Sequence, residues 1–285
     1  MRYLIVLILM PLIQMGISFI GTELLSLNNS FRNVYGLVFA QQFFAVFLPT
    51  YLLFHKKKYL PKKECIGINF SDVSRFIAIG VSLQFVGVAV NLPVSVMLQK
   101  MGYSLPKGLP MAKTPIQFFA QTVIVCLTPA IFEEVCFRRM IFSEIRKKSA
   151  VAAVLFSALF FAMAHMDFYN FPATFLIGCC FGIARTRNVP LILLIIAHFF
   201  VNLSASVLNH LLINPAISGL IQRYFLLWIF LALVILVTIF PKKKENSTPS
   251  LKLSKSFFRY LISLLKNPLF YGYCILFVVL GVRQL

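Results

Sequence analysis

Acidic residues and histidines are scarce in this chain of 285 residues, which contains eight of the former and four of the latter. Hydrophobic residues make up 60% of the sequence, with 31 phenylalanines and a mean hydropathy of +0.88. A soluble domain of this length could not bury so many apolar side chains. The composition therefore excludes a soluble globular protein and predicts a polytopic membrane protein.

Cysteine spacing of the kind that forms disulfides or binds metal is also missing. The adjacent pair Cys179 and Cys180 is poorly suited to a structural disulfide, and we interpret all the cysteines as small apolar packing residues. The cysteines are Cys65, Cys126, Cys136, Cys179, Cys180 and Cys274. Because no repeat, low-complexity tract or soluble domain is visible, we expect a single membrane domain over residues 1–285.

Long apolar runs predict an all-α fold, a polytopic bundle of transmembrane helices, because about 17 to 25 apolar residues are needed to cross a bilayer. Eight such runs lie near residues 3–24, 35–54, 73–97, 116–142, 149–166, 169–185, 189–212 and 222–240. A ninth run, Leu269–Val282, is short and fits either a tilted span or an interfacial segment. The first run has no small-residue cleavage pattern after it, which predicts a retained span rather than a signal peptide.

The net charge of +19 does not indicate a nucleic-acid partner, because the basic residues lie in loops between apolar runs. With the N-terminus inside, thirteen loop lysines and arginines fall on the cytoplasmic side and five on the other, although segment 98–115 carries three of the five. The positive-inside rule favours this orientation. We therefore expect a multi-pass integral protein of a bacterial plasma membrane with a cytoplasmic N-terminus. A basic cytoplasmic tail, 241–267, would rest against anionic lipid headgroups.

The fourth apolar run contains two adjacent glutamates, Glu133 and Glu134. An ionisable side chain at bilayer depth costs roughly 2.5 to 3.5 kcal/mol, so it normally faces a cavity and has a function. On a helix, Arg138 lies one turn after Glu134 on the same face and can neutralise it. Glu133 points about 100° away and is available for chemistry. The alternative is that both acids pair with Arg138 and Arg139 near a helix end.

Two histidines lie in later apolar runs with helical spacing to a second residue. His165 follows Phe161 by one turn, and His198 precedes Asn202 by one turn. Alone, His165 could be an interfacial packing residue, and His198 with Asn202 could join two helices by hydrogen bonds. Their ordered occurrence after the glutamates favours one shared polar site.

These motifs together resemble those of the CPBP family (CAAX protease and bacteriocin-processing, or Abi, proteins), which includes the type II CAAX prenyl endopeptidases. The resemblance covers residues 115–212 and places the protease core there. It is carried by Glu133-Glu134-x-x-x-Arg138, Phe161-x-x-x-His165 and His198-x-x-x-Asn202. Many relatives have glycine after the motif arginine, where this chain has Arg139.

The resemblance implies an intramembrane endopeptidase with a catalytic cavity between the helices. Glu133, with His165, would activate a water for attack on a peptide carbonyl, while His198 and Asn202 would donate hydrogen bonds to the developing oxyanion. The ion pair of the first motif would brace its helix. The expected substrate is a membrane-associated or lipidated peptide or protein, and no cofactor is expected.

Three other functions remain open. A zinc protease could use Glu133, His165 and His198 as ligands, although the chain has no His-Glu-x-x-His motif. A proton-coupled transporter could use the same residues as a relay, but the inverted repeats common in transporters are not visible. A non-catalytic membrane scaffold, or an immunity protein for a secreted peptide such as a bacteriocin, could also retain them.

Overall fold

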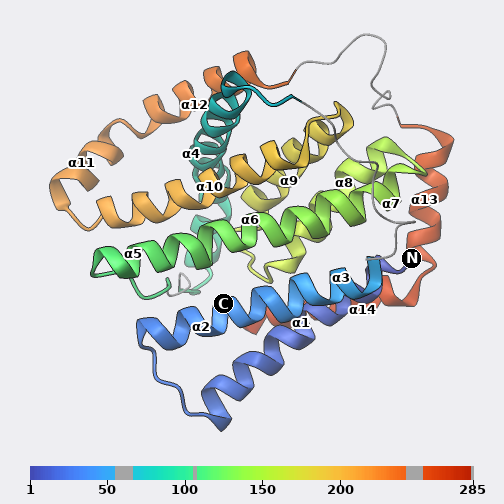
Figure 1. Cartoon of the computed structure of the whole chain (residues 1–285), viewed down its shortest axis with the longest axis horizontal. Helices are drawn as coiled ribbons and strands as arrows, with labels where there is room; N and C mark the ends of the chain where they lie inside the picture. Colours follow the sequence, from blue (N-terminus) through green and yellow to red (C-terminus); the bar gives the residue numbers. More distant parts are fainter. Residues whose placement is uncertain (55–66, 105–107, 242–252, 284–285) are drawn as a thin grey trace.

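The computed structural model describes residues 1–54, 67–104, 108–241 and 253–283. All the regular secondary structure in these residues is helical, and they contain no strand (Figure 1), as the sequence predicted. Some predicted loop residues lie outside the described residues: Lys56, Lys57, Lys58, Lys62, Lys63, Cys65, Lys107, Lys242, Lys243 and Lys244.

The first two spans form a hairpin. The first is α1 (Tyr3–Phe19) with the π-helical segment η1 (Ile20–Leu24), and the second is α2 (Phe31–Gln41), η2 (Gln42–Phe47) and α3 (Leu48–Phe54). The second span is one continuous helix of 24 residues. It begins where the Ser30 side chain accepts a hydrogen bond from the Asn33 amide, the usual cap of a helix N-terminus.

The third and fourth spans are the longest helices of the bundle's described part. α4 (Phe70–Lys100) begins with a capping box between Asn69 and Asp72. The fourth span comprises α5 (Pro115–Gln121), η4 (Thr122–Leu127), α6 (Thr128–Glu133), η5 (Glu134–Ile141) and α7 (Phe142–Arg146). Two π-helical segments thus flank α6. π-Helical segments are rare in proteins, and those that occur are often found at functional sites.

The next three helices pack closely through small residues. They are α8 (Ala150–Ala164), α9 (Phe171–Thr186) and α10 (Leu191–Leu211). A Cβ on Gly178 of α9 would come within 2.9 Å of the Ala158 backbone in α8. A Cβ on Gly80 of α4 would lie 2.3 Å from the Ala197 carbonyl oxygen in α10. Because glycine has no Cβ, the backbones of the paired helices can approach closely at these positions, as they do at small residues in other membrane bundles.

The C-terminal part contains two bent pairs of helices. α11 (Pro215–Arg223) and α12 (Phe225–Ile239) meet at 62°, and α13 (Lys255–Leu265) and α14 (Pro268–Arg283) meet at 73°. α13 lies across one end of the bundle, while α14 runs back along α1 (Figure 1). The predicted basic tail therefore includes an amphipathic helix, which buries Phe257, Tyr260 and Leu264.

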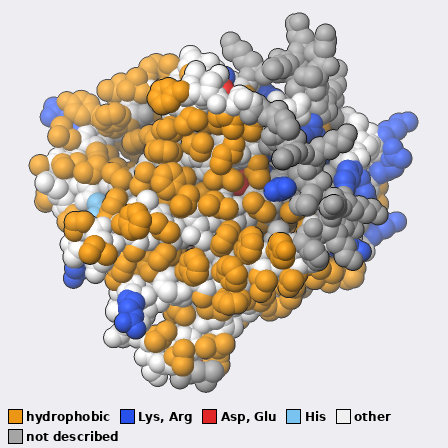
Figure 2. All heavy atoms as spheres, viewed as in Figure 1, with side chains coloured by type: hydrophobic (Ala, Val, Ile, Leu, Met, Phe, Trp, Pro, Cys, Tyr) orange, Lys and Arg blue, Asp and Glu red, His pale blue; other side chains and the backbone are white. Residues whose placement is uncertain are grey.

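Five of the described helices are long and apolar enough to cross a membrane, or seven if each bent pair forms one span. The predicted fifth and sixth runs are the shorter apolar helices α8 and α9, and the ninth run is α14. Orange apolar side chains cover most of the face shown in Figure 2. The chain is an integral membrane protein built as a helical bundle, which confirms the predicted fold class.

Candidate active site

The two glutamates lie where α6 meets η5, and both are buried within the bundle. Glu133 is 7% exposed and Glu134 is fully buried. Glu133 ends α6 and Glu134 begins η5, so the two side chains leave the helix in different directions. Each carboxylate therefore meets a different set of neighbours.

The Glu134 carboxylate faces Arg138, as the helical spacing predicted. Arg138 Nε lies 3.5 Å from Glu134 Oε2, and both side chains have no exposed surface. The guanidinium carbon also lies 4.7 Å from the Phe161 ring centroid and 5.8 Å from that of Phe181. Aromatic faces attract a desolvated cation. The buried arginine is therefore balanced by one carboxylate and two rings, which come from α8 and α9.

His198 of α10 bridges the two glutamates. Its Nδ1 lies 3.0 Å from Glu134 Oε1, and its Nε2 lies 3.8 Å from Glu133 Oε2. An ionised carboxylate oxygen only accepts hydrogen bonds, so Nδ1–H donates to Glu134. In the neutral ring, Nε2 then carries a lone pair directed toward Glu133. The contact to Glu134 thus sets both the orientation and the tautomer of the imidazole.

His165 caps the C-terminus of α8 and approaches Glu133 from another side. Its Nδ1 lies 2.8 Å from the Phe161 carbonyl oxygen, to which it donates, and its Nε2 lies 4.0 Å from Glu133 Oε2. A third of the His165 side chain, 34%, is exposed. The structure therefore brings Glu133 and both predicted histidines together, from three different helices.

Gln42 also reaches Glu133 and was not identified from the sequence. Its Nε2 donates to Glu133 Oε1 at 3.1 Å from η2 in the second span. The only sequence signal was an amide within an apolar run, next to another glutamine at position 41. Because Gln42 engages Oε1, the Glu133 Oε2 atom is the one left facing the two imidazoles.

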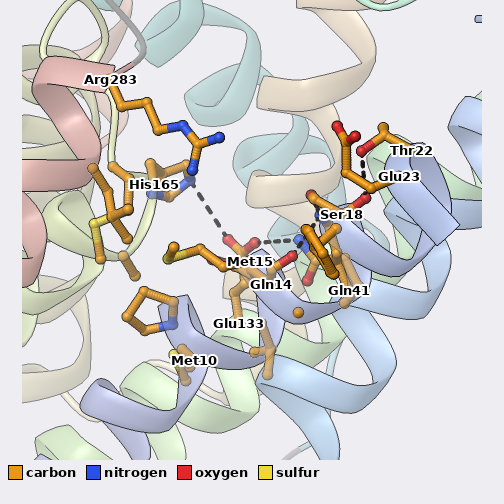
Figure 3. Close-up of a pocket in the computed structure, with 18 of the residues that line it drawn as sticks. Met10, Gln14, Met15, Ser18, Thr22, Glu23, Gln41, Glu133, His165 and Arg283 are labelled. Atoms are coloured by element: carbon orange, nitrogen blue, oxygen red, sulfur yellow. Dashed lines mark hydrogen bonds and ion pairs between the residues drawn. The ribbon is translucent and has the colours of Figure 1, made fainter.

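A cavity of about 770 Å³ opens beside this cluster. It is lined by α1, η1, η2 and η5, and by the ends of α2, α6, α8 and α14. Figure 3 shows Glu133 and His165 pointing toward one another across it, with Arg283 beside His165. The described lining residues include Glu133 and His165, whereas His198 packs behind Glu133 and is only 4% exposed.

Asn202 lies one turn after His198 on α10, half-buried. Its Nδ2 donates to the Val125 carbonyl oxygen in η4 at 3.5 Å. The described residues lining the cavity do not include Asn202. The structure thus joins Asn202 to the fourth span, but on the Val125 side of α6 and not through a contact with Glu133.

Glu133, His165 and His198 are the alternative zinc ligands that the sequence offers. No group of three or more histidine, cysteine, aspartate or glutamate side chains among the described residues is arranged to hold a metal ion. The two imidazole nitrogens lie 3.8 and 4.0 Å from Glu133 Oε2. A zinc ion requires all of its ligand atoms at about 2.0 to 2.2 Å from one centre, a condition that separations of this size do not exclude.

The burial of the ion pair predicts an unequal effect of two glutamate substitutions on stability. Glu134→Ala leaves Arg138 without its carboxylate in a site with no exposure, so the free energy of unfolding should fall by about 3 to 5 kcal/mol. Glu144→Ala breaks a pair with Lys147 whose side chains are 27% and 58% exposed, and should cost about 1 kcal/mol or less. Thermal unfolding of both variants in detergent measures the difference. Equal losses would show that the buried pair does not hold the fold.

Comparison with known proteins finds a family match in the middle of the chain. Residues 115–204 match the family model described as type II CAAX prenyl endopeptidase Rce1-like. No curated protein and no solved structure matches the chain. The matched segment runs from α5 into α10 and includes all three motifs. Residues 115–204 are therefore similar to the Rce1-like type II CAAX prenyl endopeptidases, which confirms the predicted resemblance over this segment.

Proposed function

We propose that the protein is an intramembrane endopeptidase in which Glu133, assisted by His165, activates water to hydrolyse a membrane-associated or lipidated peptide or protein. One observation carries this proposal. Glu133 Oε2 faces the Nε2 atoms of two histidines from other helices, at 3.8 and 4.0 Å, beside a cavity inside the bundle. The cluster lies within residues 115–204, whose similarity to a family of endopeptidases supports the proposal.

The distances suit a water held between the three side chains. Separations of 3.8 and 4.0 Å are too long for direct hydrogen bonds. A single water oxygen at about 2.8 Å from each partner can nevertheless contact the carboxylate and an imidazole together. With Nδ1–H of His165 donated to the Phe161 carbonyl, its neutral ring offers a lone pair at Nε2 to such a water.

Glu133 would act as the general base in the hydrolysis. It accepts a proton from the water as the water oxygen forms a bond to the carbonyl carbon of the substrate. The resulting tetrahedral intermediate carries the negative charge on the former carbonyl oxygen. Glu133 then returns the proton to the departing nitrogen as the carbon–nitrogen bond breaks. Atoms and charge balance without a covalent enzyme intermediate.

Asn202 and His198 would stabilise the oxyanion in different ways. An amide nitrogen carries two hydrogens, so Asn202 keeps one donor while the other serves the Val125 carbonyl. His198 already donates through Nδ1 to Glu134, so it can donate through Nε2 only as the imidazolium. In the neutral state its Nε2 carries only a lone pair and donates nothing.

Glu133→Gln should abolish cleavage without unfolding the protein. Removing the base should lower kcat by at least about 10² to 10⁴-fold, whereas replacing a buried, incompletely paired carboxylate should not lower stability. The assay is cleavage by purified protein in detergent of a prenylated CAAX peptide, or of another membrane peptide that the wild type cleaves. Glu144→Gln serves as the control and should keep normal activity. Near-normal cleavage by Glu133→Gln would show that Glu133 is not the base, whereas absence of cleavage by the wild type would favour a transporter or a scaffold.

Asn202→Ala should lower kcat by about 10² to 10³-fold with little change in KM, because its contact forms mainly in the transition state. Asn91→Ala is a matched control. It removes an amide that joins α4 to Asn170 and Ala173, away from the cluster, and should change stability but not kcat. If Asn202→Ala lowers only the unfolding temperature, Asn202 serves the contact with Val125 alone.

Cleavage should persist after exhaustive chelation, with elemental analysis showing less than stoichiometric metal. This expectation rests on the missing His-Glu-x-x-His motif and on the family resemblance. Stoichiometric zinc whose removal abolishes cleavage, and whose return restores it, would establish the zinc mechanism with Glu133, His165 and His198 as ligands.

A further inference from the structure

The cavity beside Glu133 runs from a buried floor to an open rim at one end of the bundle. Its floor includes Met10 and Phe137, which are 1% exposed. Its rim includes the exposed residues Thr22, Glu23 and Arg283, at the ends of η1 and α14. Figure 3 shows Met10 and the rim residues on opposite sides of the Glu133 carboxylate. The reacting groups are therefore reached from the rim end.

The opposite end of the bundle carries most of the described basic residues. Three hydrogen bonds from arginine side chains to backbone carbonyls join the segments at this end. Arg146 donates to Arg185, Arg187 donates to Pro241, and Arg75 donates to Ile239. α13 closes this end through a 2.7 Å contact between the hydroxyls of Tyr3 and Tyr260. Ten described basic residues lie there: Arg2, Arg75, Arg146, Lys147, Lys148, Arg185, Arg187, Lys255, Arg259 and Lys266. Most blue side chains visible in Figure 2 gather at this end, near α7 and α13.

The rim end carries half as many described basic residues. Its loops are joined by hydrogen bonds from Tyr35 to the Pro110 carbonyl and from Tyr169 to the Ser104 carbonyl, both 3.0 Å long. Five described basic residues lie there: Arg32, Lys100, Lys113, Arg223 and Arg283. Both α1 and α14 start at the basic end and finish at the rim. The cavity mouth and the basic loops therefore lie at opposite ends of the bundle.

Short loops rich in lysine and arginine stay in the cytoplasm. We infer that the cavity opens away from the cytoplasm and takes an extended polypeptide presented from the non-cytoplasmic side. Such a substrate is an exported peptide, or the outer juxtamembrane segment of a membrane protein, rather than a cytoplasmic lipidated C-terminus. This inference rests on the proposed function for its substrate class, whereas the side of the opening stands on the charges and the cavity alone.

The chemistry of the cavity fits such a segment. Near the floor, the apolar side chains of Met10, Val46 and Phe137 line the cavity, while Gln14 and Gln41 add amides along its wall. The rim carries one acid, Glu23, and one base, Arg283. A peptide that enters with apolar residues first and keeps its polar part at the rim buries apolar surface without burying charge.

Cysteine labelling tests the side of the opening without any need for activity. Glu23→Cys at the rim and Lys148→Cys at the basic end are introduced separately into the full chain carrying Cys65→Ser, and that parent is the control. A membrane-impermeant maleimide is added to right-side-out membrane vesicles. Glu23→Cys should react at least ten times faster than Lys148→Cys, which should react only after permeabilisation. Faster labelling of Lys148→Cys, or equal labelling of both, overturns the inference.

A second measurement tests the substrate. The full chain is reconstituted in liposomes, and the orientation is scored by the same maleimide on the Glu23→Cys variant. A water-soluble, membrane-impermeant peptide that the protein cleaves in detergent is added outside. Cleavage should follow the fraction of molecules whose rim faces outward, and cleavage that follows the inward-facing fraction overturns the inference. Absence of cleavage even in detergent would contradict the proposed function, while the labelling result would still decide the side of the opening.

Discussion

The buried ion pair between Glu134 and Arg138 is the constraint around which the centre of the bundle is organised. Neither side chain has exposed surface, and their separation is 3.5 Å. An unpaired charge at this depth would be costly, so each partner requires the other. A buried pair contributes little net stability compared with apolar packing, but its geometry is demanding. Here Arg138 contacts the aromatic rings of α8 and α9, and Glu134 Oε1 contacts His198 of α10.

The two adjacent glutamates therefore have different surroundings. Glu134 belongs to the supporting cluster, whereas Glu133 faces the cavity, held by Gln42 on one oxygen and approached by two imidazoles on the other. Each histidine has its Nδ1 engaged elsewhere, by a backbone carbonyl or by Glu134. Both rings therefore direct Nε2 at the same carboxylate oxygen. In the proposed reaction, these contacts would hold the reacting groups in place without having to change.

Local helical spacing explains how much of this site was predictable. The pairing of Glu134 with Arg138 follows from their one-turn separation, and the grouping of Glu133, His165 and His198 followed from motifs that carry a family resemblance. Gln42 was missed because its contact with Glu133 depends on how the second span packs, 91 residues away in sequence. The partner of Asn202 is a backbone carbonyl, which no sequence pattern reveals. In the same way, the long apolar runs predicted the helices but not the π-helical segments or the bends. Phe257, Tyr260 and Leu264 did carry a signal for α13, since their spacing of three and four is that of a buried helix face.

The central claim is that Glu133 and the histidines act as one unit on one water, and a double-mutant cycle on the cleavage rate tests it most directly. The rates are measured for the wild type, Glu133→Gln, His165→Ala and the double variant. Residues that act as a unit give strongly non-additive effects. The double variant should therefore cleave about as slowly as Glu133→Gln alone. If the two rate losses instead multiply, Glu133 and His165 act independently, and the shared-water account is contradicted.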